Sequence, residues 1–158
     1  MKTKKHKIHF NKTVKNNQNN GFMTSIWGPA IWHFLHIISF NYPIEPNAKQ
    51  KKYYYDFIMS LKYILPCKKC RKNLIKNFKH LPLTMKSMEN RYTFSLYIYK
   101  LHELINTMLH KKSGLSYEDV KNNYEKFRAT DCQKNIKNEI GCSKPLNGTK
   151  KKCIIKIV

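Results

Sequence analysis

Two cysteines separated by two lysines are the residues of this chain best suited to chemistry. They occur in the segment Pro66-Cys67-Lys68-Lys69-Cys70. A Cys-x-x-Cys pair can close a small disulfide ring, and nearby cations or the N-terminal end of a helix stabilise the thiolate over the thiol. The same spacing is also found in zinc and iron–sulfur sites, so the motif alone leaves redox and metal-binding roles open.

A structural zinc site would need two further ligands at a finger or knuckle spacing. The next cysteine is Cys132, and Cys132 and Cys142 do not form a second Cys-x-x-Cys pair. His80 is a single histidine in a basic turn, where a solvated side chain is the usual state. We therefore expect no metal site and favour a redox role for Cys67 and Cys70.

Aromatic and polar side chains recur at helical spacing in two other segments. Trp32, His36 and Phe40 are each four residues apart, and His102 and Asn106 are spaced in the same way, so each set shares one helix face. Either set alone fits ordinary packing around a satisfied histidine. Together with a reactive dithiol on a third helix, they form candidate walls of a pocket for a flat aromatic cofactor.

Apolar residues with the period of a helix predict five helices that position these side chains, and no strand pattern competes. Ser25 is the expected cap of the first helix, and Gly114 is expected to close the fourth. Short loops between amphipathic helices indicate an all-α, up-and-down bundle of four helices with a short fifth. The expected helices span about residues 27–42, 48–65, 67–79, 87–112 and 117–130.

Length and charge divide the chain into one domain and two basic ends. A chain of 158 residues suits a single core. Of the formal net charge of +22, six lysines and no acid lie in residues 1–20, and seven lysines against Glu139 lie in residues 132–158. We expect a disordered basic tail over 1–22, the helical domain over 23–131, and a basic, cysteine-containing tail over 132–158.

The basic composition does not by itself indicate a nucleic-acid-binding protein. Lysine outnumbers arginine 28 to 3, whereas specific contacts to bases and phosphates favour arginine. We expect attraction to acidic partners but no specific nucleic acid. No stretch approaches the roughly 20 apolar residues of a membrane span, and no apolar run of signal-peptide length follows the N-terminus. We therefore expect a soluble protein that is not secreted.

Several short motifs follow one another along the chain: Trp27-Gly28, then Trp32, Leu35-His36 and Tyr42-Pro43, then Pro66-Cys67-x-x-Cys70, then His102-x-x-x-Asn106-x-x-Leu109-x-Lys111. Their order resembles the Erv/ALR family of FAD-linked sulfhydryl oxidases over about residues 25–128. Tyr97 and a short last helix carrying Tyr124 are similar to the compact members of large cytoplasmic DNA viruses. Glu103 departs from the family pattern, because cellular members often have asparagine there.

The resemblance implies that FAD binds non-covalently at one end of the bundle, against the dithiol. It implies that Cys70 is the thiol next to the flavin and that Cys67 exchanges with the substrate. The substrates would be protein thiols, and electrons would pass to oxygen to give hydrogen peroxide. The implied cofactor contacts are Gly28, Trp32, His36, Phe40, Cys70, His102, Asn106, Leu109, Lys111 and Tyr124.

The resemblance also implies a homodimer packed through the first two helices, and a place in the host cytoplasm, at a virus factory, or in the virion. Cys132 and Cys142 could form an electron shuttle or a structural disulfide, and Cys153 is either a free thiol or an intermolecular partner. The main alternative is a non-enzymatic helical module with a Cys/His metal site and a basic surface for nucleic acid. A thiol–disulfide exchange protein without flavin is a third hypothesis, but the strands of a thioredoxin fold are missing from the pattern.

Overall fold

The structure is a computed structural model that describes residues 21–127 of the chain. All the regular secondary structure of this part is helical, and it contains no strand, as predicted. The tails predicted over 1–22 and 132–158 lie outside the described residues, except for Gly21 and Phe22. The elements are α1 (Thr24–Phe40), α2 (Ala48–Ile64), α3 (Lys68–His80), the 3-10 helix η1 (Met85–Met88), α4 (Arg91–Met108) and α5 (Tyr117–Glu125).

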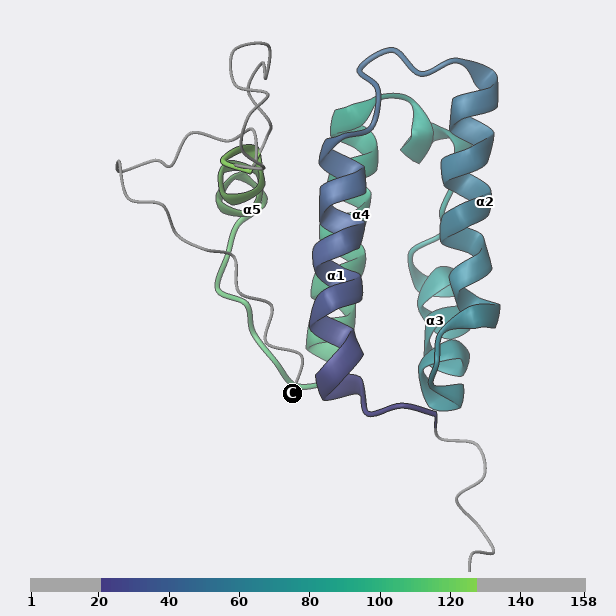
Figure 1. Ribbon diagram of the computed structural model, residues 1–158, viewed down its shortest axis with the longest axis vertical. Helices are drawn as coiled ribbons and strands as arrows, with labels where there is room; N and C mark the ends of the chain where they lie inside the picture. The colour runs from purple at the N-terminus through teal and green to yellow at the C-terminus, as the bar shows by residue number, and fades with distance from the viewer. Residues whose placement is uncertain (1–20, 128–158) are drawn as a thin grey trace, which may run out of the picture.

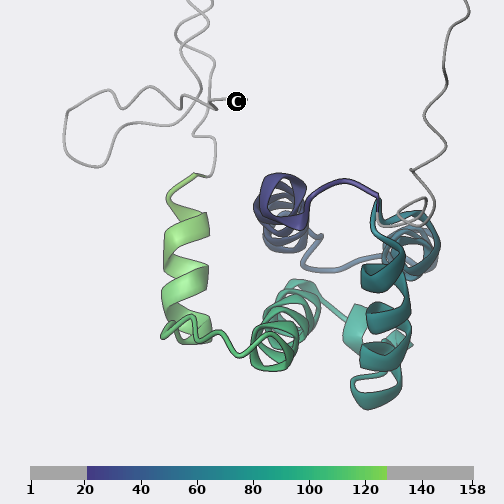
Figure 2. The ribbon, with the colours of Figure 1, turned by 90° about the horizontal axis from the view of Figure 1, so that it is seen from below.

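Four helices form the bundle, and the fifth packs on its outside. α1 lies beside α4, and α2 is followed closely by α3 on the other side of the molecule (Figure 1). Seen along α1 and α4, α5 lies next to these two helices, on the side away from α2 and α3 (Figure 2). This arrangement confirms the prediction of a four-helix bundle with a short fifth helix.

Large side chains from several helices fill the centre of the bundle. Tyr42, Ile58 and Phe94 are completely buried there. The Tyr42 hydroxyl donates a hydrogen bond to the carbonyl of Met88 at 2.9 Å, and the Tyr97 hydroxyl donates one to Leu81 at 3.0 Å. Burial of these aromatic rings supplies apolar contact area, and the hydroxyl groups keep their hydrogen bonds.

The start of α1 differs from the prediction, because Ser25 does not cap it. The helix begins at Thr24, so Ser25 lies inside its first turn, and Met23 takes the cap position without a side-chain hydrogen bond. The cause is a contact with a distant part of the chain. The Phe22 amide donates to the Pro66 carbonyl at 3.2 Å, and this hydrogen bond fixes where the chain enters α1.

The predicted fourth helix is shorter than expected at both ends. Asn90 has an extended backbone and forms a capping box with Thr93, so α4 begins at Arg91 and the preceding turn forms η1 instead. At the other end α4 stops at Met108, because His110 takes a left-handed conformation with φ of 55°. Gly114, the predicted terminator, lies further along in the loop with φ of 69°.

α5 begins where the sequence predicts and ends earlier. Ser116 and Asp119 form its capping box, as the Ser-x-x-Asp pattern indicates. The helix ends at Glu125, before the predicted end near Thr130, which lies outside the described residues. None of the helices over residues 21–127 is both long and apolar enough to cross a membrane.

Candidate active site

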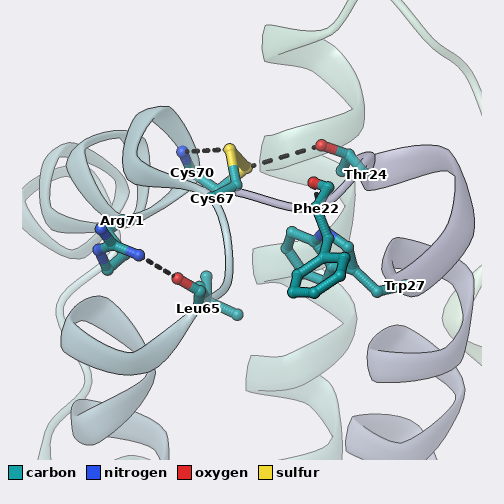
Figure 3. The surroundings of a disulfide bond; sticks show 7 residues. All are labelled: Phe22, Thr24, Trp27, Leu65, Cys67, Cys70 and Arg71. Atoms are coloured by element: carbon teal, nitrogen blue, oxygen red, sulfur yellow. Dashed lines mark hydrogen bonds between the residues drawn. A yellow bond between two sulfur atoms is a disulfide. The ribbon is translucent and has the colours of Figure 1, made fainter. Parts of the chain in front are cut away.

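The two cysteines of the motif are joined by a disulfide at the start of α3. Their Cα atoms are 5.1 Å apart. Cys67 is the N-cap of α3, and its Sγ accepts a hydrogen bond from the backbone amide of Cys70 at 3.1 Å (Figure 3). A sulfur in this position faces the positive end of the helix dipole, which favours a thiolate when the disulfide is open.

The turn between α2 and α3 holds the dithiol in place. Pro66 follows the C-cap residue Leu65 of α2, and the guanidinium of Arg71 donates a hydrogen bond to the Leu65 carbonyl (Figure 3). A side chain from the first turn of α3 therefore holds this turn by a hydrogen bond to its backbone. Arg71 thus has a structural role in this turn.

The two cysteines differ in burial. Cys67 is only 8% exposed, whereas Cys70 is partly buried. Exposure therefore does not single out Cys67 as the sulfur that meets the substrate. The separate roles of Cys67 and Cys70 stay predictions that rest on the family resemblance.

A cluster of aromatic rings from three helices joins most of the predicted cofactor residues. The Trp32 indole of α1 stacks on the His102 imidazole of α4, with ring centroids 4.0 Å apart and planes 7° apart. Tyr124 of α5 stacks on His36, with centroids 5.1 Å apart, and on Phe40 at 5.6 Å. The structure thus brings together side chains that are separated by up to 92 residues in the sequence, from Trp32 to Tyr124.

Two imidazoles at the centre of this cluster share a hydrogen bond. His36 Nε2 and His102 Nδ1 are 3.0 Å apart. Burial, with smaller contributions from the nearby His102 and His33, lowers the pKa of His36 to about 4. Burial also lowers the pKa of His102. Both rings are therefore neutral at pH 7, so one nitrogen of the pair donates and the other accepts.

One polar atom of the cluster has no partner in the described part of the chain. His36 is buried, and its Nδ1 makes no hydrogen bond there. Buried polar groups are nearly always hydrogen-bonded in folded proteins. An orphaned ring nitrogen among flat aromatic faces is therefore the kind of group that a bound cofactor would satisfy.

The remaining predicted cofactor residues of α4 lie at its C-terminal end. The Asn106 amide donates to the Glu103 carboxylate at 2.8 Å. Glu103, the residue that departs from the family pattern, therefore engages the side chain of a predicted cofactor contact. Leu109 and Lys111 are exposed in the turn that follows, and the Lys111 amide donates to the Asn106 carbonyl at 2.8 Å.

Gly28 is buried in α1, close to the start of the helix. A Cβ atom at this position would lie 3.3 Å from Cγ2 of Thr24. Gly28 takes part in none of the hydrogen bonds described above between the other predicted cofactor residues, and it has no ring to stack on theirs. Its place near Thr24 puts it at the end of the bundle that holds the dithiol.

A cavity of about 570 Å³ lies between α3 and α4, and Lys69 of the Cys-x-x-Cys motif is one of the residues that line it. It includes Asn77, which is 4% exposed and whose Nδ2 makes no hydrogen bond in residues 21–127. Leu109 is the one predicted cofactor residue that lines it. The lining residues are Lys69, Asn73, Lys76, Asn77, His80, Leu104, Thr107, Met108 and Leu109.

Sequence reasoning missed two residues at this site. Asn77 is one, and Thr24 is the other, with its Oγ1 3.8 Å from Cys70 Sγ (Figure 3). Asn77 lies two turns after Cys70 on α3, so helical periodicity could have placed it on the same face. No local pattern identifies Thr24, because the contact joins residues 46 positions apart.

Some of the cysteine predictions concern residues beyond this region. Cys132, Cys142 and Cys153 lie outside the described residues, so the shuttle and the structural disulfide both stay predictions. Within residues 21–127 the structure brings together no group of three His, Cys, Asp or Glu side chains that could hold a metal ion.

Comparison with known proteins identifies relatives, among them two viral proteins. A probable FAD-linked sulfhydryl oxidase of Acanthamoeba polyphaga mimivirus is 34% identical over 94 residues, which are 60% of this chain and 65% of that protein. The FAD-linked sulfhydryl oxidase of an African swine fever virus isolate is 31% identical over 99 residues, 63% of this chain and 80% of that protein.

A solved structure shows the same fold. The crystal structure of the yeast Erv1 core matches with a TM-score of 0.59 at 20% identity, and the match covers 74% of this chain and 96% of the yeast chain. The model of the Erv1/Alr family matches residues 29–128, which is more than half of the chain and includes the dithiol and the aromatic cluster. The chain belongs to the Erv1/Alr family.

Proposed function

We propose that this chain is an FAD-dependent thiol oxidase that forms disulfide bonds in protein thiols and passes the electrons to oxygen, giving hydrogen peroxide. The observation that carries the proposal is the Cys67–Cys70 disulfide at the N-cap of α3, in a member of the Erv1/Alr family. The mimivirus and African swine fever virus relatives are named FAD-linked sulfhydryl oxidases, which supports the same activity here.

The side chains of the aromatic cluster fit FAD. His36 Nδ1 lacks a hydrogen-bond partner within residues 21–127, and Trp32, His102 and Tyr124 present flat ring faces. Since Trp32 and His102 now stack on each other, a flat ring that binds between them must replace that contact. Trp32, His36, Phe40 and Tyr124 would hold the rings of the cofactor.

The polar part of FAD would bind along α4. His102 and Asn106 offer hydrogen-bonding groups on one helix face, and Lys111 offers a charge for a phosphate group. Glu103 accepts from the Asn106 amide, so this amide must exchange that partner if it is to bind the cofactor.

The dithiol supplies the first half of the reaction. A substrate thiolate attacks Cys67 Sγ, the Cys67–Cys70 bond breaks, and its electron pair stays on Cys70 Sγ as a thiolate. A second substrate thiolate attacks the substrate sulfur of the mixed disulfide and releases Cys67 as a thiolate. Two substrate thiolates are thereby oxidised to one disulfide, and the Cys67–Cys70 disulfide is reduced by two electrons.

The surroundings of Cys67 favour its release in the second step. The Cys70 amide donates to Cys67 Sγ, and the helix dipole stabilises negative charge at this position. When bound, FAD supplies the acceptor for the electron pair and passes it to oxygen.

Absorbance and oxygen consumption test the proposed function. The purified full-length protein should be yellow with flavin absorbance, and it should consume oxygen and produce hydrogen peroxide when dithiothreitol is added. A colourless protein that shows no thiol-dependent oxygen uptake even after addition of FAD would contradict the proposal. Bound zinc together with salt-sensitive binding to nucleic acid would favour the helical metal-binding module instead.

We also propose that the chain forms a homodimer through α1 and α2. Phe34 of α1 packs edge-on against Phe57 of α2, with ring centroids 6.1 Å apart, and remains 48% exposed. Burial of further exposed apolar side chains on these helices against a second copy would stabilise a dimer. These side chains are Ile26, Ile37, Tyr53, Tyr63 and Ile64.

We further propose that the protein acts in the cytoplasm of an infected host cell, at a virus factory, with packaging into the virion as an additional site. The relatives in mimivirus and African swine fever virus support this placement. Immunolabelling of infected cells and of purified virions tests it. Labelling confined to a secretory compartment would contradict it.

A further inference from the structure

Residues 21–24, just before and at the start of α1, form a short segment that crosses the dithiol. We call this segment the strap. The Phe22 amide donates to the Pro66 carbonyl at 3.2 Å. The Phe22 carbonyl accepts a hydrogen bond from Trp27 Nε1 at 3.0 Å. The strap is thus attached both to the residue before Cys67 and to the first turn of α1. Figure 3 shows Phe22 beside Trp27, and Thr24 next to the disulfide.

Close backbone packing also fixes the strap. Gly21 has φ of 67°, and a Cβ atom there would lie 1.3 Å from the Pro66 carbonyl oxygen and 3.2 Å from the Cys67 Cα. No side chain fits in that space, and the left-handed conformation favours glycine. The strap therefore rests directly on the backbone of the Pro66–Cys67 segment.

This packing places a hydroxyl group at the second sulfur of the disulfide. Thr24 Oγ1 lies 3.8 Å from Cys70 Sγ. Because a disulfide sulfur carries no hydrogen, the hydroxyl is the only possible donor in this contact. Cys67 Sγ has a different donor, the Cys70 amide at 3.1 Å. Each sulfur of the dithiol thus has its own hydrogen-bond donor.

We propose that Thr24 is a positioning residue that orients Cys70 Sγ and stabilises the thiolate that Cys70 carries after the disulfide opens. When a thiolate attacks Cys67 Sγ, the electron pair of the broken bond goes to Cys70 Sγ. A hydrogen bond to an anion is stronger than one to a neutral sulfur. The Thr24 contact therefore strengthens as Cys70 leaves, which favours attack at Cys67.

The role of this contact in turnover rests on the proposed function, but its effect on the dithiol can be measured without turnover. Stabilising the Cys70 thiolate stabilises the reduced form, so it makes the disulfide easier to reduce. Loss of the Thr24 hydroxyl should therefore lower the reduction potential. It should also shift the pH midpoint for alkylation of Cys70 to higher pH.

The experiment compares Thr24→Val with Thr24→Ser in the full-length protein. Thr24→Val keeps the shape and removes the hydroxyl, whereas Thr24→Ser keeps the hydroxyl. Each protein is equilibrated without oxygen in glutathione buffers, and the redox state and alkylation of the Cys67–Cys70 peptide are read by mass spectrometry. Thr84→Val, at an exposed threonine whose one described side-chain partner is Ser87, is the matched control.

We expect Thr24→Val to shift the equilibrium with glutathione toward the disulfide by about three- to tenfold, and Thr24→Ser and Thr84→Val to stay within about twofold of the parent. An unchanged equilibrium and alkylation profile in Thr24→Val would overturn the proposal. Failure of Thr24→Ser to restore the parent values would also overturn it, because the threonine would then act by filling space.

A second variant tests the strap without removing the hydroxyl. Gly21→Ala forces the strap away from Pro66, so it should shift the glutathione equilibrium in the same direction as Thr24→Val. An unchanged equilibrium in Gly21→Ala would contradict the role of the strap. If flavin and oxidase activity are absent but the Thr24→Val shift is present, the proposed function fails and this inference stands.

Discussion

At the residue scale, the paired imidazoles of His36 and His102 make the cluster sensitive to pH. His36 has a pKa lowered to about 4 by burial, with smaller contributions from His102 and His33. An unfolded chain would protonate the same ring near pH 6.5. Between these values the unfolded state binds a proton that the folded state excludes. The free energy of unfolding therefore falls as the pH drops from about 6.5 toward 4, and this loss is complete below about pH 4.

His36→Gln should make this pH dependence shallower, by roughly 1 kcal/mol per pH unit between pH 6.5 and 4, because the titrating ring is removed. Urea unfolding of the purified protein at a series of pH values gives the slope. His80→Gln, at an exposed histidine of α3, is the matched control and should leave the slope unchanged. Equal slopes in the parent and His36→Gln would show that the buried ring does not exclude the proton.

Residue spacing predicted which side chains of this site could do chemistry. It did not predict all of their contacts. Steps of four residues were enough to place Trp32, His36 and Phe40 together, because they repeat along one helix face. Thr24 could not be found in this way, since its contact with Cys70 depends on how the strap lies on the Pro66 turn. Contacts between distant segments leave no mark in a local sequence pattern.

At the element scale, the two ends of α4 show that apolar periodicity alone does not set the boundaries of a helix. Asn90 and Thr93 form a capping box that the apolar periodicity did not reveal, so the predicted helix began too early. The C-terminal end was set by His110, which takes the left-handed conformation that glycine normally supplies. A helix can thus end at a residue whose type does not predict a helix end.

His110→Gly should raise the free energy of unfolding by about 1 kcal/mol, because it removes the cost of a side chain in the left-handed region. Chemical denaturation measures this difference directly. Gly114→Ala is the converse test, since Gly114 has φ of 69° and open space around it, and it should lose about 1 kcal/mol. Destabilisation by His110→Gly would mean that the histidine side chain contributes more than the strain costs.

At the scale of the whole molecule, apolar periodicity predicted the number and order of the helices, because each must bury one face. Short loops then left little choice except an up-and-down bundle. The partner of the exposed apolar side chains on α1 and α2 could not be predicted from periodicity, because a helix face is apolar whether its own chain or a second copy covers it.

Phe34→Glu should convert the proposed dimer into a monomer, because it would place a charge at the centre of the apolar contact. Light scattering coupled to size-exclusion chromatography measures the mass of each protein. Glu substitution at Met85, an exposed apolar residue of η1 that is 52% exposed, is the matched control. A parent protein that is monomeric at all concentrations would contradict the dimer, and a dimeric Phe34→Glu would contradict this interface.

The reduction of bound flavin by a dithiol in the absence of oxygen tests the central claim most directly. The full-length protein and its Cys70→Ser variant are mixed with dithiothreitol, and flavin absorbance is followed with time. We predict rapid bleaching in the parent, and bleaching slowed by at least about a hundredfold in Cys70→Ser, because the electron pair cannot reach the cofactor without the Cys70 thiolate. Equally rapid bleaching in both proteins would contradict the account.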